Sequence, residues 1–260
     1  MDLQLKNKVI IVTGGSSGIG EAISRLLAEE GAIPVIASRN AARNAALQQE
    51  LAAKGQPSHS FNGELSEADF CEKIVRETAE RYGRIDALVN NAGRNDGVGL
   101  ATGNPAAFAN SFAENLSHYY NLAHFALPWL KEARGSIVNI SSKVAMTGQG
   151  GTSGYAAAKG AQLALTREWA AELLPFGIRV NAILPAEVMT PLYENWMQTF
   201  EKPAEKLAAI VSKIPLEHRM TTADEIASAT AFLLSAKASH ITGQWWVIDG
   251  GYVHLDRALT

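Results

Sequence analysis

The chain of 260 residues has little cysteine and no long apolar run. Its one cysteine, Cys71, excludes an internal disulfide and is typical of a reducing compartment. The most apolar stretch, "LAHFALPWL", is interrupted by His124 and Pro128 and is far shorter than the ~18 residues that a membrane span requires. The opening "MDLQLKNKVI" lacks the apolar core and cleavage site of a signal peptide. We therefore expect a cytoplasmic protein with no membrane partner.

The sequence also has no marked excess of either charge. It contains 23 Lys and Arg against 26 Asp and Glu, which gives a net charge of -3. That balance indicates neither a nucleic-acid surface nor a polybasic membrane patch. The histidines show no metal-ligand spacing, because His118 and His124 fall on different faces of a helix, and no metal site is predicted. The expected partner is a small molecule or another copy of the chain.

What the sequence does contain is a regular alternation of short apolar runs and longer helical patterns. "KVIIVT", "IPVIAS", "IDALVN", "SIVNIS" and "GIRVNAILP" are continuous rather than alternating, which is typical of parallel strands buried on both faces. The pattern predicts a Rossmann-type, doubly wound α/β fold with about seven strands in one domain spanning 1–260. One long helix is expected from about Pro105 to Ala133. The segment 186–216, rich in proline, is expected to form a substrate loop with short helices.

Five glycines each precede a predicted strand, where the preceding helix must end. A residue in the left-handed conformation commonly ends a helix, and glycine adopts that conformation without strain. We therefore expect left-handed helix ends at Gly31, Gly55, Gly83, Gly135 and Gly177.

The loop "VTGGSSGIG" joins the first strand to the first helix. Its glycines let backbone N–H groups and the helix dipole approach a pyrophosphate. The loop residues predicted to bind a dinucleotide are Gly14, Ser16, Ser17, Gly18, Ile19 and Gly20. A tight turn without ligand remains an alternative. A more distant one is an α/β-hydrolase with Ser16 as nucleophile and His240 or His254 as its partner, although no oxyanion loop precedes the site.

The end of the second strand, "IASRN", bears on the choice of cofactor. NAD-binding folds commonly place an acid there to bind the ribose 2′-hydroxyl, and a basic residue accommodates the 2′-phosphate of NADP. Here Ser38 stands where the acid would be, and Arg39 follows, with Arg43 one turn further on. The pattern favours NADP, with NAD as the open alternative.

Tyr155 and Lys159 in "SGYAAAKG" share one face of a predicted helix. Ser142 follows a strand at the edge that also carries the glycine loop, so the three side chains can meet. The pKa of a free tyrosine, ~10, is too high for a general base near neutrality. A lysine ~5 Å away at an effective dielectric of ~20 would contribute ~3 kcal/mol, or about two pKa units toward the phenolate. The pattern predicts that Ser142 holds a substrate oxygen and that Tyr155 takes its proton while hydride leaves for a nicotinamide.

The glycine loop, "NNAG", the Ser142–Tyr155 spacing and the YxxxK pair together resemble the short-chain dehydrogenase/reductase family, from Lys8 to Gly251. The resemblance implies that Asn115 is a fourth catalytic residue in a proton relay through Lys159. It also implies that "PAEVMT" contacts the nicotinamide, with Ala186 replacing the usual glycine, and that the terminal strand helps to form a homotetramer. The further cofactor residues that it implies are Glu64, Leu65, Asn91, Gly93, Pro185, Val188 and Thr190.

The substrate is predicted from the loops around this crevice. Gln149, Glu187 and Trp196 supply the hydrogen-bonding groups and the aromatic face that a sugar needs, beside Ser142 and Tyr155. "NISSK", "TGQG", "PAEVMTPLYENW" and "GGYVHLDRAL" resemble the bacterial L-fucose dehydrogenases, which implies oxidation of L-fucose or a related aldose to the lactone.

Two other functions remain open. The first is a 3-oxoacyl thioester reductase, whose acidic carrier protein would favour a basic rim. The segment 186–219 instead holds four Lys and Arg against five Glu. The second is a catalytically idle NADP-binding regulator, which we would expect to have lost Ser142, Tyr155 or Lys159.

Overall fold

The computed structural model describes residues 1–255, which form one layered α/β unit around a seven-stranded sheet. All strands are parallel, in the order β3-β2-β1-β4-β5-β6-β7, as expected for a doubly wound fold. Their bounds are β1 Val9–Thr13, β2 Ile33–Ser38, β3 His59–Asn62, β4 Ala87–Asn90, β5 Ser136–Ile140, β6 Arg179–Pro185 and β7 Trp245–Ile248. The strand order reverses between β1 and β4, and in such sheets ligands bind where that reversal leaves a crevice. The predicted fold class is confirmed.

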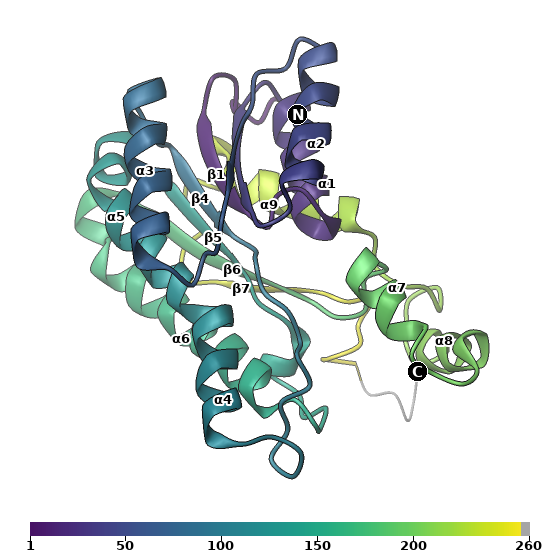
Figure 1. The fold of residues 1–260 in the computed structure, drawn as a ribbon. Helices are drawn as coiled ribbons and strands as arrows, with labels where there is room; N and C mark the ends of the chain where they lie inside the picture. Colours follow the sequence, from purple (N-terminus) through teal and green to yellow (C-terminus); the bar gives the residue numbers. More distant parts are fainter. Residues whose placement is uncertain (256–260) are drawn as a thin grey trace.

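Helices cover both faces of the sheet (Figure 1). One face carries α1 (Gly18–Glu29), α2 (Ala41–Ala53) and α9 (Ala223–Leu234), and the other carries α3 (Ala68–Tyr82), α5 (His118–Ala133) and α6 (Ser153–Glu172). All five residues of β1, "VIIVT", are buried, because no strand face between these layers meets water. This is the physical reason for continuous apolar runs in the sequence.

The long helix expected from Pro105 to Ala133 is present but is not regular. It begins as α4 (Pro105–Phe112), passes through a π-helical turn, η1 (Ala113–Ser117), and continues as α5. Single π turns are rare and occur mostly at functional sites. This one contains Asn115, whose side-chain Nδ2 donates a hydrogen bond to the Ser111 carbonyl at 2.9 Å. The sequence could not predict this π turn, because the helical pattern of hydrophobic residues is nearly the same before the turn, in α4, and after it, in α5.

The expected left-handed helix ends are found at four of the five glycines, Gly31, Gly55, Gly83 and Gly177. The expectation is wrong for Gly135, because the preceding residue, Arg134, takes the left-handed conformation with φ 46°. Gly135 is required for another reason, because a side chain at this position would collide with the neighbouring backbone. A Cβ atom there would lie 2.4 Å from the carbonyl oxygen of Asp86.

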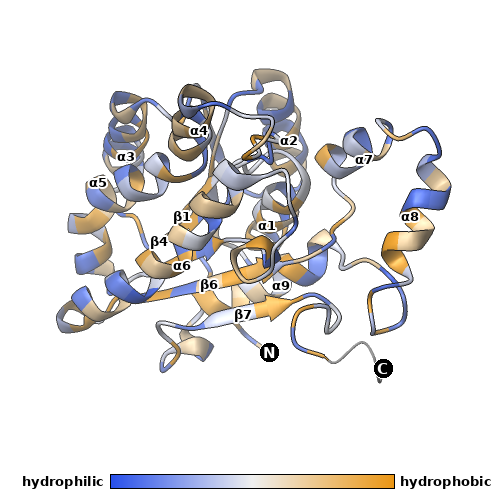
Figure 2. Cartoon of the chain, turned by 90° about the horizontal axis from the view of Figure 1, so that it is seen from below, coloured by the Kyte–Doolittle hydropathy of each residue, from blue (hydrophilic) through white to orange (hydrophobic). Residues whose placement is uncertain are grey.

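The segment after β6 leaves the body of the protein and carries α7 (Pro191–Met197) and α8 (Pro203–Val211). Figure 2 shows both helices standing apart from the sheet, with hydrophilic and hydrophobic residues mixed along α8, none of which is buried. The chain returns beneath them in a turn that follows β7. There the Asp249 carboxylate accepts the N–H groups of Gly251 and Val253 at 2.8 and 2.7 Å. No helix within residues 1–255 is long and apolar enough to cross a membrane.

Candidate active site

A crevice of about 590 Å³ opens at the carboxyl ends of β1, β2, β4, β5 and β6. The structure brings most of the predicted cofactor and catalytic residues to its walls: Gly14, Ser16, Ser17, Gly18, Ile19, Ser38, Arg39, Glu64, Leu65, Asn91, Gly93, Ser142, Tyr155, Lys159, Pro185, Val188 and Thr190. The predicted residues that do not reach these walls are Gly20, Asn115, Gln149, Glu187 and Trp196. The predicted cofactor residues therefore nearly all line the crevice, whereas three of the predicted substrate residues, Gln149, Glu187 and Trp196, do not.

The glycine loop has the backbone shape that a pyrophosphate site needs. Gly14 and Gly18 have φ values of 63° and 56°, a conformation that side chains rarely adopt. Gly20 has a different role, because a Cβ atom there would lie 2.3 Å from the Gly14 carbonyl oxygen, so it lets α1 pack on the loop. Ser17 stands at the N-cap of α1 without a side-chain capping bond. The first-turn N–H groups of α1 are thus free to face an anion at the crevice, and the loop fits a dinucleotide.

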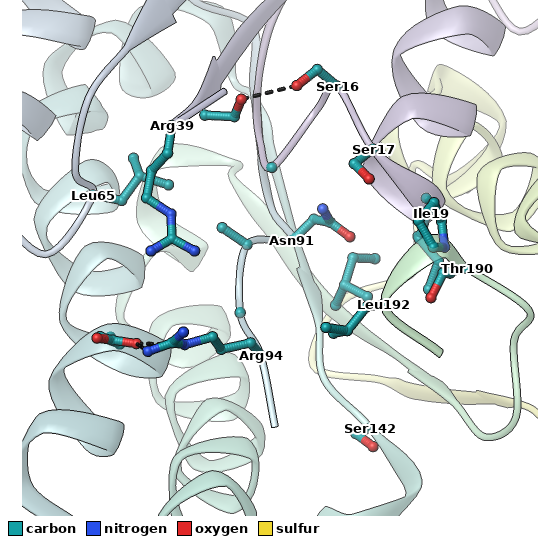
Figure 3. Close-up of a pocket in the computed structure, with 18 of the residues that line it drawn as sticks. Ser16, Ser17, Ile19, Arg39, Leu65, Asn91, Arg94, Ser142, Thr190 and Leu192 are labelled. Atoms are coloured by element: carbon teal, nitrogen blue, oxygen red, sulfur yellow. Dashed lines mark hydrogen bonds and ion pairs between the residues drawn. The ribbon is translucent and has the colours of Figure 1, made fainter. Parts of the chain in front are cut away.

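Arginines and hydroxyls gather where β2 ends, and no acid stands at that strand end (Figure 3). The hydroxyls of Ser16 and Ser38 are hydrogen-bonded at 2.9 Å, and neither His240 nor His254, the partners that a nucleophilic Ser16 would need, lines the crevice around Ser16. Arg39 is more than half exposed and lies 3.7 Å from Glu64. Arg43, which was not among the predicted cofactor residues, also lines the crevice, and its guanidinium donates to the Ser17 hydroxyl at 2.8 Å. The signal for Arg43 was its spacing one helical turn after Arg39.

Ser142, Tyr155 and Lys159 meet at the far end of the crevice. Ser142 lies two residues beyond β5 and caps a short 3-10 turn. The Lys159 ammonium lies 5.5 Å from the centroid of the Tyr155 ring, so the two side chains share one helix face as predicted. The ammonium donates to the Ile140 carbonyl at 2.8 Å and to the hydroxyl of Tyr119 at 3.5 Å.

Burial controls the ionisation of this pair in the protein alone. It raises the pKa of Tyr155 to about 12, against a smaller lowering by the Ser142 hydroxyl, and it lowers the pKa of Lys159 to about 7. In the protein alone, the effect of burial on the pKa of Tyr155 is therefore larger than any lowering by its neighbours, because removal from water disfavours the phenolate. An acidity of Tyr155 near neutrality requires a further positive charge in the crevice.

Asn115 lies behind the crevice wall rather than in it. Its side-chain oxygen accepts the backbone N–H of Arg94 at 2.8 Å, and its carbonyl accepts the Gln162 side-chain amide at 2.8 Å. A Cβ atom on Gly93 would lie 2.8 Å from the Asn115 side-chain oxygen and 3.6 Å from the Lys159 nitrogen. The π turn thus holds Asn115 against the backbone of the segment that follows β4, close to Lys159.

The predicted substrate residues are the ones that the structure arranges differently. Gln149 is exposed on its loop, and Glu187 forms a largely buried ion pair with Lys143. Trp196 packs edge-to-face on Tyr193 with ring centroids 5.1 Å apart. Tyr193 lines the crevice and contacts two of these side chains, Glu187 and Trp196. The sequence pattern alone did not single out Lys143, although it directly follows Ser142.

On the opposite wall, Arg94 and Glu114 form an ion pair at 2.9 Å, and both line the crevice. His118 also lines it, and burial together with the Lys159 charge lowers the pKa of this imidazole to about 3. His118 is therefore neutral at any physiological pH. Within residues 1–255 there is no cluster of three or more His, Cys, Asp or Glu side chains that could hold a metal ion.

Comparison with known proteins identifies the class. A family profile described as "Enoyl-(Acyl carrier protein) reductase" matches residues 14–253. The chain belongs to the short-chain dehydrogenase/reductase family, and it is an NAD(P)-dependent enzyme that acts on CH–OH groups.

Individual relatives within the family point to two kinds of substrate. The chain is 36% identical to L-fucose dehydrogenase of Mus musculus (94% of this chain, 88% of that protein). It is 34% identical to 3-oxoacyl-[acyl-carrier-protein] reductase FabG of Thermotoga maritima (96% of this chain, 100% of that protein).

Two solved structures are similar over nearly the whole chain. The Cj0485 dehydrogenase has a TM-score of 0.94 and 48% identity, covering 100% of this chain and 99% of that one. The aldohexose dehydrogenase of Thermoplasma acidophilum has a TM-score of 0.86 and 30% identity, covering 97% and 96%.

Proposed function

We propose that the protein is an NADP-preferring dehydrogenase that oxidises the anomeric carbon of L-fucose or a related aldose to the lactone. The observation that carries this proposal is the substrate end of the crevice. There the hydroxyls of Ser142 and Tyr155 line the same crevice as the Arg94–Glu114 ion pair, and these groups together offer donors and acceptors for a polyol. The similarity to an L-fucose dehydrogenase and to an aldohexose dehydrogenase supports it.

The geometry suggests a role for each polar group. Ser142 donates a hydrogen bond to the anomeric oxygen, and Tyr155 accepts the proton from that oxygen as its carbon is oxidised. When bound, the nicotinamide accepts the hydride and, in its oxidised form, supplies the positive charge that Tyr155 needs. Lys159 stabilises the phenolate, and Asn115 positions the Gly93–Arg94 backbone and the neighbourhood of Lys159.

The preference for NADP follows from the residues at the end of β2. Ser38 and Arg39 stand where an acid would bind a free ribose 2′-hydroxyl. Arg43, held beside Ser17, supplies a second guanidinium at the same corner, and guanidinium groups bind phosphate in a bidentate manner.

A 3-oxoacyl-[acyl-carrier-protein] reductase is the second candidate, favoured by the similarity to FabG. An acidic carrier protein binds best to unpaired basic side chains. At the substrate end of the crevice and along the segment after β6, several cations have acidic partners: Arg94 with Glu114, Lys143 with Glu187, Lys202 with Glu205, and Arg219 with Glu217 and Glu225. That pairing favours a small neutral substrate.

A substrate panel tests the proposal directly. The formation or loss of reduced nicotinamide is followed with L-fucose, D-arabinose, L-galactose and an acetoacetyl thioester, each with NADP and NAD. The expected result is a higher kcat/KM for the sugars, and for NADP over NAD. A higher kcat/KM for the thioester would transfer the assignment to the second candidate. Tyr155→Phe is the control for background turnover.

We also propose that residues 186–216 act as a lid over the substrate and that the protein is a homotetramer. The edge strand β7 is only half-buried within one chain, which supports an interface there. Light scattering coupled to size-exclusion chromatography gives the mass of the particle, and a monomer would contradict this part of the proposal.

A further inference from the structure

Three separate segments meet in one polar cluster beside Ser142. Lys143 follows Ser142, Glu187 follows β6, Tyr193 lies in α7, and Tyr252 lies in the turn after β7. Lys143 pairs with Glu187, and their side chains are only 11% and 12% exposed. The Lys143 ammonium also lies 4.1 Å from the centroid of the Tyr252 ring. The cluster therefore fixes the substrate loop relative to the catalytic serine.

The hydroxyl of Tyr193 is turned into this cluster and away from the crevice. Its oxygen is fully buried next to the Glu187 carboxylate. Burial and that carboxylate raise the pKa of Tyr193 far above its ordinary value, so the phenol stays neutral. Because the hydroxyl faces inward and Trp196 packs edge-to-face at 5.1 Å, the part of Tyr193 that lines the cavity is its ring.

The two sides of the crevice consequently differ in polarity. On the α7 side the crevice is lined by Pro191, Leu192 and Tyr193, with Asn195 as the polar member of this wall. The other side carries the Arg94–Glu114 ion pair. Figure 3 shows Arg94 and Leu192 on opposite sides of the space, with Ser142 beyond both. A sugar with hydroxyls along one edge and a methyl group at one end matches this division.

We propose that Tyr193 is a specificity-determining residue whose ring receives the C6 methyl group of a 6-deoxyaldose, and that the Lys143–Glu187 pair is its positioning element. This inference rests on the proposed function and extends it from aldoses in general to those with an apolar C6. A C6 hydroxyl placed against the ring of Tyr193 would lose hydrogen bonds to water there, and the ring offers no replacement, which disfavours the ordinary hexose.

Three sugars isolate the contact, because they differ only at one position. On C5, L-fucose carries a methyl group, L-galactose carries a hydroxymethyl group, and D-arabinose carries only hydrogen because it lacks C6. The wild type is expected to prefer L-fucose to L-galactose by kcat/KM. In Tyr193→Ala the ratio should fall by roughly 10- to 100-fold, the range for a methyl-sized contact, while the rate with D-arabinose changes least. In Tyr193→Phe, which keeps the ring, the ratio should stay close to that of the wild type.

The positioning role is tested with the same ratio. Lys143→Met should lower the ratio of kcat/KM for L-fucose over L-galactose. The double variant K143M/E187Q should lower the same ratio, and because it leaves no unpaired buried charge, it controls for a loss of folding. Lys143→Arg should restore part of that ratio. The exposed Tyr120 on α5 gives a matched control, since Tyr120→Ala should leave the ratio and the affinity for NADP unchanged. The Kd for NADP, from cofactor fluorescence, should be the same in all variants.

The outcomes separate the two proposals. Wild-type enzyme that oxidises none of the three sugars overturns the proposed function, and the assignment of Tyr193 with it. Wild-type enzyme that oxidises them without preferring L-fucose, or a ratio unaltered in Tyr193→Ala, overturns only the assignment of Tyr193.

Discussion

At the scale of single residues, the chemistry of the site depends on the amine of Lys159 and the phenols of Tyr155 and Tyr119. Burial disfavours the charged form of all three groups. The Lys159 ammonium lies near the rings of both Tyr155 and Tyr119, 5.5 and 5.8 Å from their centroids. Burial raises the pKa of Tyr155 to about 12 and lowers the pKa of Lys159 to about 7. In the protein alone Tyr155 therefore stays protonated at neutral pH, and we expect a bound oxidised nicotinamide to supply the positive charge that lowers its pKa.

Tyr155→Phe is expected to reduce kcat by roughly 10²- to 10⁴-fold, the usual contribution of a general base, with the Kd for NADP nearly unchanged. The phenol of Tyr155 must lose its proton to act in oxidation. Because its pKa is raised, kcat/KM for oxidation should increase with pH as the phenolate forms, and the reverse reaction should not. Loss of the proton from Lys159 should then reduce kcat/KM and form the alkaline limb of the profile. A pH profile in both directions checks this, and near-normal turnover of the variant would exclude the proton-transfer role.

Tyr119→Phe should lower kcat by roughly 2- to 10-fold, the worth of one hydrogen bond of about 0.5–1.5 kcal/mol. The Tyr119 hydroxyl donates to the Ile140 carbonyl at 3.0 Å and accepts from Lys159 at 3.5 Å. Its loss removes an acceptor that favours the ammonium, so the pKa of Lys159 falls and the alkaline limb of the profile moves to lower pH.

The neighbouring Tyr120 is the control for this substitution, because it is 54% exposed. Tyr120→Phe should change neither kcat nor the position of the alkaline limb. Equal profiles for the two variants would show that Tyr119 only fills space.

At the scale of elements, the strands and the glycine loop could be predicted, and the substrate contacts could not. A parallel strand between two helical layers must be apolar along its length, and a backbone with positive φ at Gly14 and Gly18 requires glycine. The π turn at Asn115 could not be predicted, because it does not change the spacing of hydrophobic residues along the sequence. Glu187 has the residue type of a sugar ligand, but its partner Lys143 comes from a distant connection, and only the folded chain brings the two together.

The loops after β1 and β2 define a cofactor test at this scale. Arg43→Ala should lower the ratio of kcat/KM for NADP over NAD by roughly 10- to 100-fold, because a charged hydrogen bond to phosphate contributes about 1.5–3 kcal/mol. Arg76→Ala on the exposed face of α3 is the matched control, since Arg76 lies outside the residues that line the crevice. A ratio that does not change in Arg43→Ala would assign discrimination to Arg39 alone.

At the scale of the whole molecule, the two edges of the sheet have different tasks. The carboxyl edge carries the crevice. The amino edge carries Asp86, whose carboxylate accepts the Val9 N–H at 2.9 Å, pairs with Lys8 at 3.0 Å and bonds to Arg84. Burial alone would raise the pKa of Asp86, but these partners outweigh it and lower the pKa below its ordinary value. The ion pairs of Asp86, which stabilise the fold, thus lie at the amino ends of the strands, and the crevice lies at their carboxyl ends.

Asp86→Asn should therefore lower the free energy of unfolding by about 1–3 kcal/mol at neutral pH without altering kcat. Because the pKa of Asp86 is lowered by folding, its contribution is present above the ordinary carboxyl pKa of ~4 and is lost as the pH falls below that value. Urea unfolding at neutral and acidic pH should show the two proteins converging in acid. Asp69→Asn, at an exposed position, should show no such convergence.

The turn after β7 has a practical consequence for anyone who produces this protein. Tyr252 lies against Lys143, and the Gly250 carbonyl accepts the backbone N–H of Leu216, so this turn contacts both the connection after β5 and the segment after β6. In Figure 1 the N-terminus lies far from this region. We expect a purification tag attached shortly after Tyr252 to disturb these contacts and so to alter the assay that it was meant to enable. Measurements of sugar preference should be made with the tag on the N-terminus or removed.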